Sequence, residues 1–441
     1  MIGSVLLCRI CDKIICMKDK KLIIASGILL ILSMIIHFAF FGQPREVVFD
    51  EVYFGRFISS YEKGEYFFDI HPPLGKLLIF GFVHFAHVHV DDDFSMIGNA
   101  YVSYDYLFLR FLPCLVGAFI PIILFFVALS MDYSFRSATV LCMLTIFENS
   151  LVVQTHFLFL DGFLLFFIFL AVLMYVLYLK KRKIYTLIFF GIFCGMAISV
   201  KWTGATFFFM IILYDFCTQI NYTKQYVWER IFCFVVIPCM IYFAIFMVHF
   251  SILSYPKQDY TYISRDFYFE SDLDRIDTFN EAVINTFCQF WELNHEMYVS
   301  NKNLIQSHPY SSQWFEWPLM IKPIFYWTDD HGRSIYYFGN CVVWFFGLTA
   351  VILAFINQWK IKFQKNSFLN FLLLGYFVNW IPFIFIDRVM FLYHYMTSFI
   401  FSVMILVYLL DKKHFFKKID IIVVILTVFM FLALYPITYG I

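Results

Sequence analysis

The sequence predicts an all-α membrane protein, built as one domain over residues 1–441 with about eleven transmembrane helices. Of its residues, 62% are hydrophobic and only 15% are charged, whereas a soluble domain carries about 25% charged residues. Mean hydropathy is +0.76. Several apolar stretches approach the roughly 20 residues that a helix needs to cross a bilayer. Backbone groups within hydrocarbon must be bonded inside their own segment, so we expect helices and no open sheet.

The apolar stretches define the expected spans in order. They are 22–41, 107–129, 138–155, 158–178, 184–200, 203–218, 230–253, 336–356, 368–386, 391–410 and 419–436. The apolar run over 138–179 is too long for one span, so we expect a helical hairpin whose tip holds its polar residues. The pair 184–218 is expected to fold in the same way around Lys201 and Trp202.

Basic residues indicate the orientation of these spans. Lys and Arg gather in the N-terminal segment and in short loops around 136, 180–183, 224–230, 360–365 and 412–418. Short loops rich in Lys and Arg are typical of the cytoplasmic side. We therefore expect a cytoplasmic N-terminus and a lumenal C-terminus. The first span is long and no small-residue cleavage site follows it, so we interpret it as a retained anchor.

Two long segments fall on the lumenal side, at about 42–106 and 254–335. The first contains adjacent carboxylates, Asp50 and Glu51, followed by His-Pro-Pro-Leu-Gly-Lys at 71–76. A residue before proline avoids the helical region, while proline is well tolerated at a helix start. We therefore expect a helix from Leu74 to about Val88. It is too short to span and is typical of a helix lying in the membrane interface.

Charged residues are costly near the bilayer and are usually functional there. On this topology several fall at the lumenal ends of spans, namely Asp50, Glu51, Arg110, Glu148, Asp161, Lys201, Arg388 and His394. This distribution disfavours an ion transporter, which needs polar sites near the midplane. It favours a cavity at one face, in which cations could hold a phosphate and a carboxylate could accept a proton.

Other polar groups have simpler interpretations. Net charge is zero, so no nucleic-acid partner is expected. Cys8 and Cys11 form a close pair without further ligands, and we interpret it as incidental. The histidines and aspartates at 84–93 have the composition of a metal cluster, but a solvated loop explains them more simply. No metal or cofactor is expected.

The motifs that follow one another along the chain resemble those of the protein O-mannosyltransferase family, whose members have a GT-C type fold. The matching segments include Phe-Asp-Glu-Val-Tyr-Phe-Gly at 49–55 and the run at 68–76. They continue at 109–110, 148–150, 160–161, 199–202, 307–309, 317–318, 339–344 and 391–395. Each segment alone is weak evidence for the family. The resemblance is specific because the segments occur in the family's order and fit a topology of eleven spans.

The resemblance implies transfer of mannose from dolichyl-phosphate-mannose to Ser or Thr hydroxyls of proteins in the endoplasmic reticulum lumen, by a homo- or heterodimer. Asp50 would be the catalytic base, with Glu51 beside it shaping the acceptor site. Donor-phosphate contacts would come from Arg110, Lys201, Arg388, His394 and Tyr395. Residues expected to shape the site are His71, Pro72, Pro73, Lys76, Glu148, Asn149, Asp161 and Trp202.

The chain departs from the family pattern in two respects. The segment 254–335 is too short to contain the lumenal β-trefoil (MIR) domain that members usually carry there. Gln154-Thr155-His156 stands where a Ser-Arg pair is expected, and Val52-Tyr53 replaces the commoner Val-His. These differences bear on acceptor contacts more than on the reaction.

Three alternatives remain open at this point. A GT-C transferase acting on a glycolipid would differ in its acceptor. A transporter would keep its activity after Asp50→Asn. An inactive subunit would need a partner for activity. The topology has a separate test, because the sequon at Asn221 is expected in the cytosol, and a glycan there would contradict the span assignment.

Overall fold

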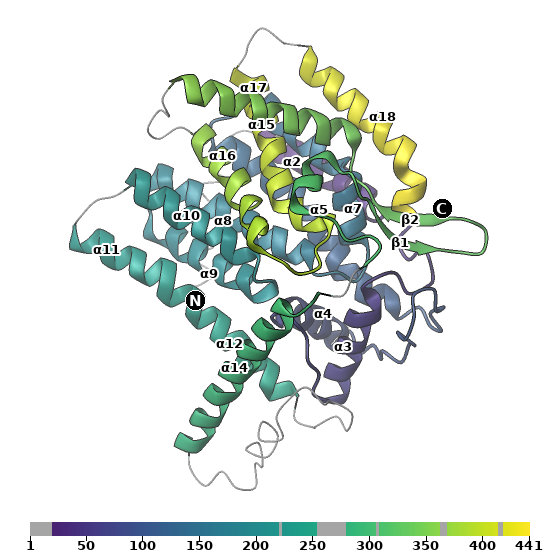
Figure 1. Cartoon of the computed structure of the whole chain (residues 1–441). Helices are drawn as coiled ribbons and strands as arrows, with labels where there is room; N and C mark the ends of the chain where they lie inside the picture. Colours follow the sequence, from purple (N-terminus) through teal and green to yellow (C-terminus); the bar gives the residue numbers. More distant parts are fainter. Residues whose placement is uncertain (1–19, 220–222, 254–278, 306–307, 362–367, 413–417) are drawn as a thin grey trace.

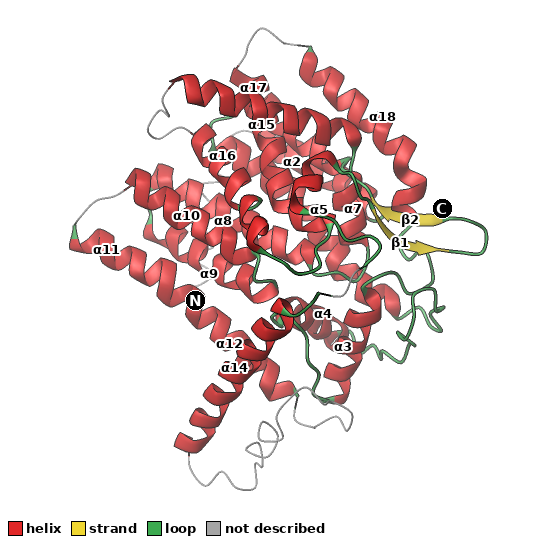
Figure 2. Ribbon diagram, in the orientation of Figure 1, coloured by secondary structure: helices red, strands yellow, loops and turns green. Residues whose placement is uncertain are grey.

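A computed structural model describes residues 20–219, 223–253, 279–305, 308–361, 368–412 and 418–441. The Cys8 and Cys11 pair, the sequon asparagine Asn221 and Ser307 lie outside these residues. The described chain is a bundle of helices with one small hairpin of strands at its edge (Figures 1 and 2). The predicted all-α class is therefore confirmed, with that hairpin as the exception.

The helices follow one another along the whole chain. Those in the first half are α2 Lys20–His37, α3 Glu51–Lys63, α4 Leu74–Phe85, α5 Tyr106–Ser130, α6 Phe135–Ile146, α7 Asn149–His156, α8 Asp161–Lys181, α9 Ile184–Val200 and α10 Gly204–Gln219. The second half contains α11 Lys224–Ile231, η1 Phe232–Val236, α12 Ile237–Ile252, α14 Phe279–Lys302, η3 Trp314–Leu319, α15 Cys341–Ile361, α16 Phe368–Val378, η4 Ile381–Phe385, η5 Leu392–Tyr395, α17 Met396–Lys412 and α18 Ile419–Tyr439.

Each of the eleven expected spans overlaps one of these helices or a run of them. Among the described residues, eight helical segments are long and apolar enough to cross a membrane. A ninth is the pair α6 and α7, which is bent by 57°. The remaining two expected spans correspond to α9 and α10, apolar helices of 17 and 16 residues. The chain is thus a multi-pass membrane protein.

The bend between α6 and α7 has a local cause. Glu148 lies at the break in an extended conformation, and its side chain accepts a hydrogen bond from the backbone N–H of Ser150. A side chain that caps a helix in this way fixes where the helix begins. The bend brings α7 against α8. Gln154 near the end of α7 then reaches Asp161, the first residue of α8.

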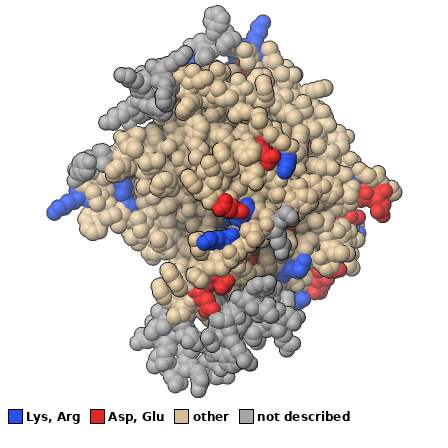
Figure 3. Space-filling view, viewed as in Figure 1, with Lys and Arg blue, Asp and Glu red and all other residues tan. Residues whose placement is uncertain are grey.

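The helices differ in how deeply they are buried. In α8, 83% of the spanning residues are buried inside the protein, whereas in α2 and α18 only 22% are. α8 therefore forms the centre of the bundle, with α5 and α9 packed against it, and α2 and α18 lie at its outside. Charged side chains are sparse over much of the face drawn in Figure 3, as expected of a surface in contact with lipid.

The segment 42–106 packs against one end of the bundle. α4 begins at Leu74, directly after Pro73, as the two prolines predict, and it ends at Phe85, three residues before the expected Val88. α3 begins at Glu51 and packs against α4. Both helices lie close together in Figure 1, below the spans that they cover.

The strands β1 Ile324–Thr328 and β2 Ser334–Tyr337 were not predicted. They pair antiparallel beside the C-terminal end of α18 (Figure 2). Because residues 334–337 form a strand, the eighth span begins at Cys341 instead of 336. This corrects our boundary, which merged the aromatic strand with the apolar helix that follows it.

Candidate active site

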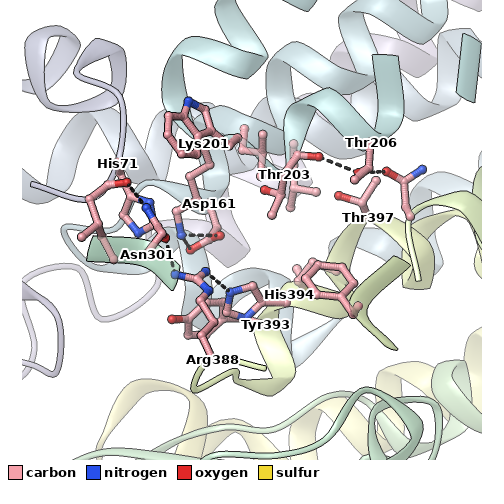
Figure 4. Close-up of a pocket in the computed structure, with 17 residues that line it drawn as sticks. His71, Asp161, Lys201, Thr203, Thr206, Asn301, Arg388, Tyr393, His394 and Thr397 are labelled. Carbon is pink, nitrogen blue, oxygen red and sulfur yellow. Dashed lines mark hydrogen bonds and ion pairs between the residues drawn. The ribbon is translucent and has the colours of Figure 1, made fainter. Parts of the chain in front are cut away.

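A cavity opens where the ends of several helices meet, and Figure 4 shows the side chains around it. It holds about 630 Å³ of empty space, part of it open to solvent. The polar residues on its wall are His71, Asp161, Lys201, Trp202, Thr203, Thr206, Asn301, Asn379, Arg388, Tyr393, His394 and Thr397. They come from segments far apart in sequence, and six of them were predicted to belong to the site.

One side of the cavity holds a buried ion pair. Lys201 Nζ donates to both carboxylate oxygens of Asp161, at 2.8 and 2.9 Å. Asp161 opens α8 and Lys201 follows the last residue of α9, so each charge lies at the helix end whose dipole favours it. Gln154 Nε2 donates to Asp161 at 2.7 Å, and Lys201 Nζ lies 5.2 Å from the centre of the Tyr393 ring.

The cavity wall also presents a second cation, Arg388. Its Nη1 donates to Asn301 Oδ1 at 2.5 Å, and its Nη2 lies 3.3 Å from His394 Nε2. In the described part of the chain, no carboxylate lies within ion-pair distance of this guanidinium. Burial lowers the pKa of Arg388. A half-buried guanidinium without an acid partner is a ready site for an anion, and phosphate matches its geometry.

His394 is held as a neutral acceptor for this arginine. Its ring lies parallel to Trp317, 6.0 Å between centroids, and its Nδ1 lies 3.0 Å from the carbonyl oxygen of Phe391. A tautomer protonated on Nδ1 donates to that carbonyl and leaves Nε2 free to accept from Arg388. The neighbouring Tyr395 points elsewhere: it is buried and shares a 2.8 Å hydrogen bond with Tyr376.

Tyr395 was expected to contact the donor phosphate, and the structure places it away from the cavity wall. The physical reason is its position in the first turn of a helix. Along a helix, adjacent residues point in different directions, so His394 faces the cavity while Tyr395 faces α16 and packs on Trp344.

Asp50 lies directly before α3. It is not among the residues that line the cavity, but it is close enough to the ion pair for the charges of Lys201 and Asp161 to act on it. Its carboxylate accepts no hydrogen bond from any side chain or backbone group that the structure describes. Burial raises its pKa to about 7; the charge of Lys201 lowers it, while those of Asp161 and Asp69 raise it further. A carboxylate whose pKa is near neutrality is suited to accept a proton from a hydroxyl.

Glu51 is in the opposite situation, because it is fully buried and saturated with donors. It accepts hydrogen bonds from the backbone N–H groups of Val48 and Leu158, at 2.8 and 3.0 Å, and from the Tyr101 hydroxyl at 3.0 Å. Arg110 donates to its two oxygens, through Nε at 2.8 Å and Nη2 at 2.7 Å. These contacts leave Glu51 no exposed oxygen with which to touch an acceptor.

Arg110 is part of this buried pair and is absent from the cavity wall. Two further N–H groups, on Nη1 and Nη2, donate to the carbonyl oxygens of Pro44 and Glu46, at 2.8 and 2.7 Å. We predicted a phosphate contact for Arg110, and the arrangement differs from that prediction. The arginine holds together α3, the segment before it and α5, so we assign it to the structure around Asp50.

The His-Pro-Pro-Leu-Gly-Lys run joins α4 to the cavity. His71 lies on the cavity wall, and burial lowers its pKa well below the usual value, so it is neutral. Lys76 is buried, forms an ion pair with Asp69 and donates to the carbonyl oxygen of His71 at 2.9 Å. Pro72 and Pro73 bring the chain into α4. These contacts join the run to the cavity wall, and its role in shaping the site stays a prediction.

Of the other residues predicted to shape the site, Glu148 and Asn149 lie away from the cavity wall and Trp202 lies on it. Glu148 accepts from the backbone N–H of Asn340 at 3.0 Å and from Trp344 Nε1 at 3.2 Å, which ties α7 to the start of α15. Asn149 donates to Thr438 Oγ1 at 2.8 Å. Trp202 lies on the cavity wall, and its Nε1 donates to Tyr242 at 2.9 Å.

Several polar residues of this region were not predicted as site residues, and three of them form hydrogen bonds around its charged groups. Asn301 joins Arg388 to the carbonyl oxygen of Ile70, 2.8 Å from its Nδ2. Gln154, noted in the sequence only as a departure from the family pattern, binds Asp161. Tyr326 donates to Gln154 Oε1 at 2.6 Å. They lie in α14, α7 and β1, and neutral amides and hydroxyls occur in such elements without a functional role, so composition alone gives no signal for them.

The histidines and acids at 84–93 do not come together as a metal site. Within the described residues, no group of three or more His, Cys, Asp or Glu side chains could hold a metal ion. His89 Nδ1 lies 2.6 Å from Glu62 Oε1, on the surface of the α3–α4 pair.

Comparisons with known proteins find relatives over most of the chain. A family model described as dolichyl-phosphate-mannose-protein mannosyltransferase matches residues 27–254, and one described as the C-terminal four-transmembrane region of protein-O-mannosyltransferase matches 286–441. Dolichyl-phosphate-mannose--protein mannosyltransferase 4 of Schizosaccharomyces pombe is 29% identical over 66% of this chain and 40% of its own length. Protein O-mannosyl-transferase 1 of Danio rerio is 31% identical over 48% of this chain and 31% of its own length. The matches thus span well under half of these relatives.

The fold is also similar to solved structures. The S. cerevisiae protein O-mannosyltransferase Pmt1-Pmt2 complex bound to the sugar donor contains a chain that matches with a TM-score of 0.86 and 18% identity, over 96% of this chain and 91% of that one. ArnT from Cupriavidus metallidurans bound to undecaprenyl phosphate matches with a TM-score of 0.54 and 11% identity, over 88% of this chain and 60% of that one. The predicted GT-C type fold is confirmed.

Proposed function

The chain belongs to the dolichyl-phosphate-mannose-protein mannosyltransferase family, and we propose that it transfers mannose from dolichyl-phosphate-mannose to Ser or Thr hydroxyls of proteins. The observation that carries this proposal is the presence of two unlike groups near the Asp161–Lys201 ion pair, one on the cavity wall and the other, Asp50, within range of the charges of that pair. Arg388 is a half-buried cation that lacks an acid partner among the described residues. Asp50 is a carboxylate without a hydrogen-bond donor in the same part of the chain, and its pKa is about 7.

The two groups suit the two ends of a single displacement. The acceptor oxygen forms a bond to the anomeric carbon and gives its proton to the Asp50 carboxylate. The bond from that carbon to the phosphate oxygen breaks, and its electron pair leaves with dolichyl phosphate. One base on the attacking side suffices, as in inverting glycosidases. A β-linked donor would therefore give an α-linked product.

Charge on the phosphate increases as the donor bond breaks. Arg388, with Lys201 on the wall of the same cavity, would bind the leaving phosphate more tightly than the intact donor, and such binding lowers the barrier. His394 and Asn301 hold the guanidinium in place. The scheme includes no metal or cofactor.

We place the protein in the endoplasmic reticulum membrane, with a cytoplasmic N-terminus and a lumenal C-terminus, as the Lys and Arg distribution favours. We further propose that it acts as a homo- or heterodimer. A Pmt1-Pmt2 complex among the structures of similar fold supports a related partner.

The test is transfer of labelled mannose from dolichyl-phosphate-mannose to a Ser/Thr-rich peptide, in membranes containing the parent chain, Asp50→Asn or Asp330→Asn at equal expression. Asp330 is exposed on the hairpin turn and serves as the matched control. Loss of a general base costs about 10²–10⁴-fold. Transfer by the parent and by Asp330→Asn, with loss in Asp50→Asn, is expected. Transfer to a glycolipid but not to peptide would contradict the proposed acceptor.

A further inference from the structure

The β1–β2 hairpin contains an irregularity that turns a tyrosine toward the site. Phe325 pairs with Tyr336 and Trp327 pairs with Ile335, so Tyr326 is an extra residue in β1. Side chains of a regular strand alternate between its two faces, whereas a bulge can direct two consecutive side chains to one face. Tyr326 and Trp327 are accordingly both buried. Bulges are common next to active sites, where they redirect a side chain.

The hydroxyl of Tyr326 reaches the cavity through two hydrogen bonds. It donates to Gln154 Oε1 at 2.6 Å, and Gln154 Nε2 donates to Asp161 at 2.7 Å. Asp161 in turn holds Lys201. Burial raises the pKa of Tyr326 well above its usual value, so the hydroxyl remains a donor. It therefore fixes the amide so that Nε2, and not Oε1, faces the carboxylate.

The ring of Tyr326 reaches the other half of the site. It stacks on Phe49, with centroids 4.3 Å apart and planes inclined by 12°. Phe49 has a φ of 43°, a conformation that residues other than glycine rarely adopt. Such a conformation persists only where the surroundings impose it. Phe49 directly precedes Asp50, so the Tyr326 ring that holds Phe49 also sets the direction in which the Asp50 side chain points.

A second contact of the hairpin supports the same segment. Trp327 Nε1 donates to Glu46 Oε2 at 2.7 Å. The bulge thus supplies two consecutive aromatic residues that both bind the stretch leading to the carboxylate. Phe159, in the loop before α8, packs edge-on against both Tyr326 and Phe49, at 5.4 and 6.2 Å.

We propose that Tyr326 is a positioning residue that couples the two halves of the site, its ring directing Asp50 and its hydroxyl directing Lys201 through Gln154 and Asp161. This inference deepens the proposed function and rests on it for the identity of the reaction. It gives the hairpin a role in catalysis. The ring and the hydroxyl act on different groups, so their loss has separable consequences.

The test compares Tyr326→Phe, which removes only the hydroxyl, with Tyr326→Leu, which also removes the stacked ring. Tyr336→Phe is the matched control: it removes a hydroxyl from the same hairpin, and no described residue forms a hydrogen bond with that hydroxyl. Kinetic constants for the donor and the pH dependence of transfer are measured for each. The amount of folded protein and its melting temperature in detergent are measured alongside.

For Tyr326→Phe we expect the KM for the donor to rise roughly fivefold, the size of one lost hydrogen bond, with kcat little changed. For Tyr326→Leu we expect kcat to fall as well and the acid limb of the pH profile to move, because Asp50 gains access to water. Tyr336→Phe should match the parent. Reduced folded protein with parent kinetic constants in both Tyr326 variants would overturn the proposal, as would an unchanged donor KM in Tyr326→Phe.

A binding measurement separates this inference from the proposed reaction. Dolichyl phosphate is titrated against each variant, and the rise in melting temperature is followed. Tyr326→Phe should need roughly fivefold more ligand for the same rise than the parent or Tyr336→Phe. If the variants bind dolichyl phosphate in this way but the parent transfers no mannose, the proposed function is contradicted. The role of Tyr326 in directing Lys201 would still stand. A parent that dolichyl phosphate does not stabilise would overturn both.

Discussion

Replacing Arg110 with methionine tests whether this arginine supports the fold around Asp50, as its contacts indicate, or binds phosphate, as the family resemblance implies. The side chains of Arg110 and Glu51 are fully buried and form an ion pair at 2.7 Å. Methionine would leave the carboxylate buried with only its neutral donors. Breaking a buried pair by removing one partner costs about 3–5 kcal/mol, because the remaining charge is uncompensated.

The assay is the apparent melting temperature in detergent of Arg110→Met, Glu51→Gln and the double variant. With an unfolding entropy of about 2.1 cal/mol/K per residue, a cost of this size in a chain of 441 residues corresponds to a fall of roughly 3–5 °C in Arg110→Met. The double variant should lose less than the sum of the two single variants, because the neutral amide no longer needs a cation. Arg56→Met, on the exposed side of α3, is the control and should change little.

The opposite result would refute this reasoning. If Arg110→Met melted with the parent and was no longer stabilised by dolichyl phosphate, Arg110 would be a phosphate ligand. The buried pair would then be a feature of the ligand-free arrangement only. If it melted lower but was still stabilised by dolichyl phosphate, its structural role would be confirmed.

Further predictions concern charge and pH. Transfer should rise with pH through about 7, because burial raises the pKa of Asp50 to that value and the base must be ionised. Lys201→Met removes a charge that lowers this pKa, so the acid limb should move to higher pH; an unmoved limb would contradict this. Arg388→Gln should raise the KM for the donor about tenfold or more, as expected for a lost charged contact. Arg333→Gln, on the hairpin turn, should leave that KM unchanged, and equal effects would contradict a specific contact. Lys76→Met should lower the melting temperature roughly as much as Arg110→Met, because its aspartate partner is also buried; a parent-like value would show that the pair is not needed for stability.

The spans could be predicted because the bilayer imposes the same requirement on every helix that crosses it. α8 is largely buried in protein and α18 largely exposed, yet both were identified from their apolar runs. Lipid and protein interior both exclude unpaired polar groups, so the composition of a span does not depend on which of them it faces. The bend at Glu148 could not be predicted in this way, since it depends on a capping bond.

The cavity could be predicted in part. Asp161, Lys201, Arg388 and His394 lie at the ends of spans on one side, and that shared location was enough to predict that they line one cavity. Which buried charges form ion pairs with each other could not be predicted from the sequence. Arg110 and Glu51 are 59 residues apart, and nothing in either local sequence indicates that they pair.

The hairpin was missed although the sequence contained a signal for it. Ile324–Thr328 is a run of β-branched and aromatic residues, followed by Asp-Asp-His-Gly, which is typical of a turn. The apolar helix that begins at Cys341 obscured the second strand, whose aromatic residues are equally compatible with a span. The bulge at Tyr326 depends on pairing between strands and has no counterpart in local sequence.

The adjacent carboxylates show how one dipeptide can supply two unlike groups. Asp50 and Glu51 lie at the start of a helix, where consecutive side chains point in different directions. Glu51 points into the protein, where five hydrogen bonds stabilise its charge. Asp50 lies on the side of Lys201 and receives no hydrogen bond from the described residues, so its charge is poorly stabilised and its pKa rises to about 7.

The fold is therefore more stable when Asp50 is protonated. Because the folded-state pKa lies above the unfolded value, this contribution is present in full below about pH 4 and is lost as pH rises through about 7. Asp50→Asn should accordingly melt above the parent at pH 8, with a difference that shrinks toward pH 5, whereas Glu51→Gln should melt below the parent at both. Equal melting temperatures for Asp50→Asn and the parent across this range would show that the Asp50 carboxylate is not held at a cost to stability.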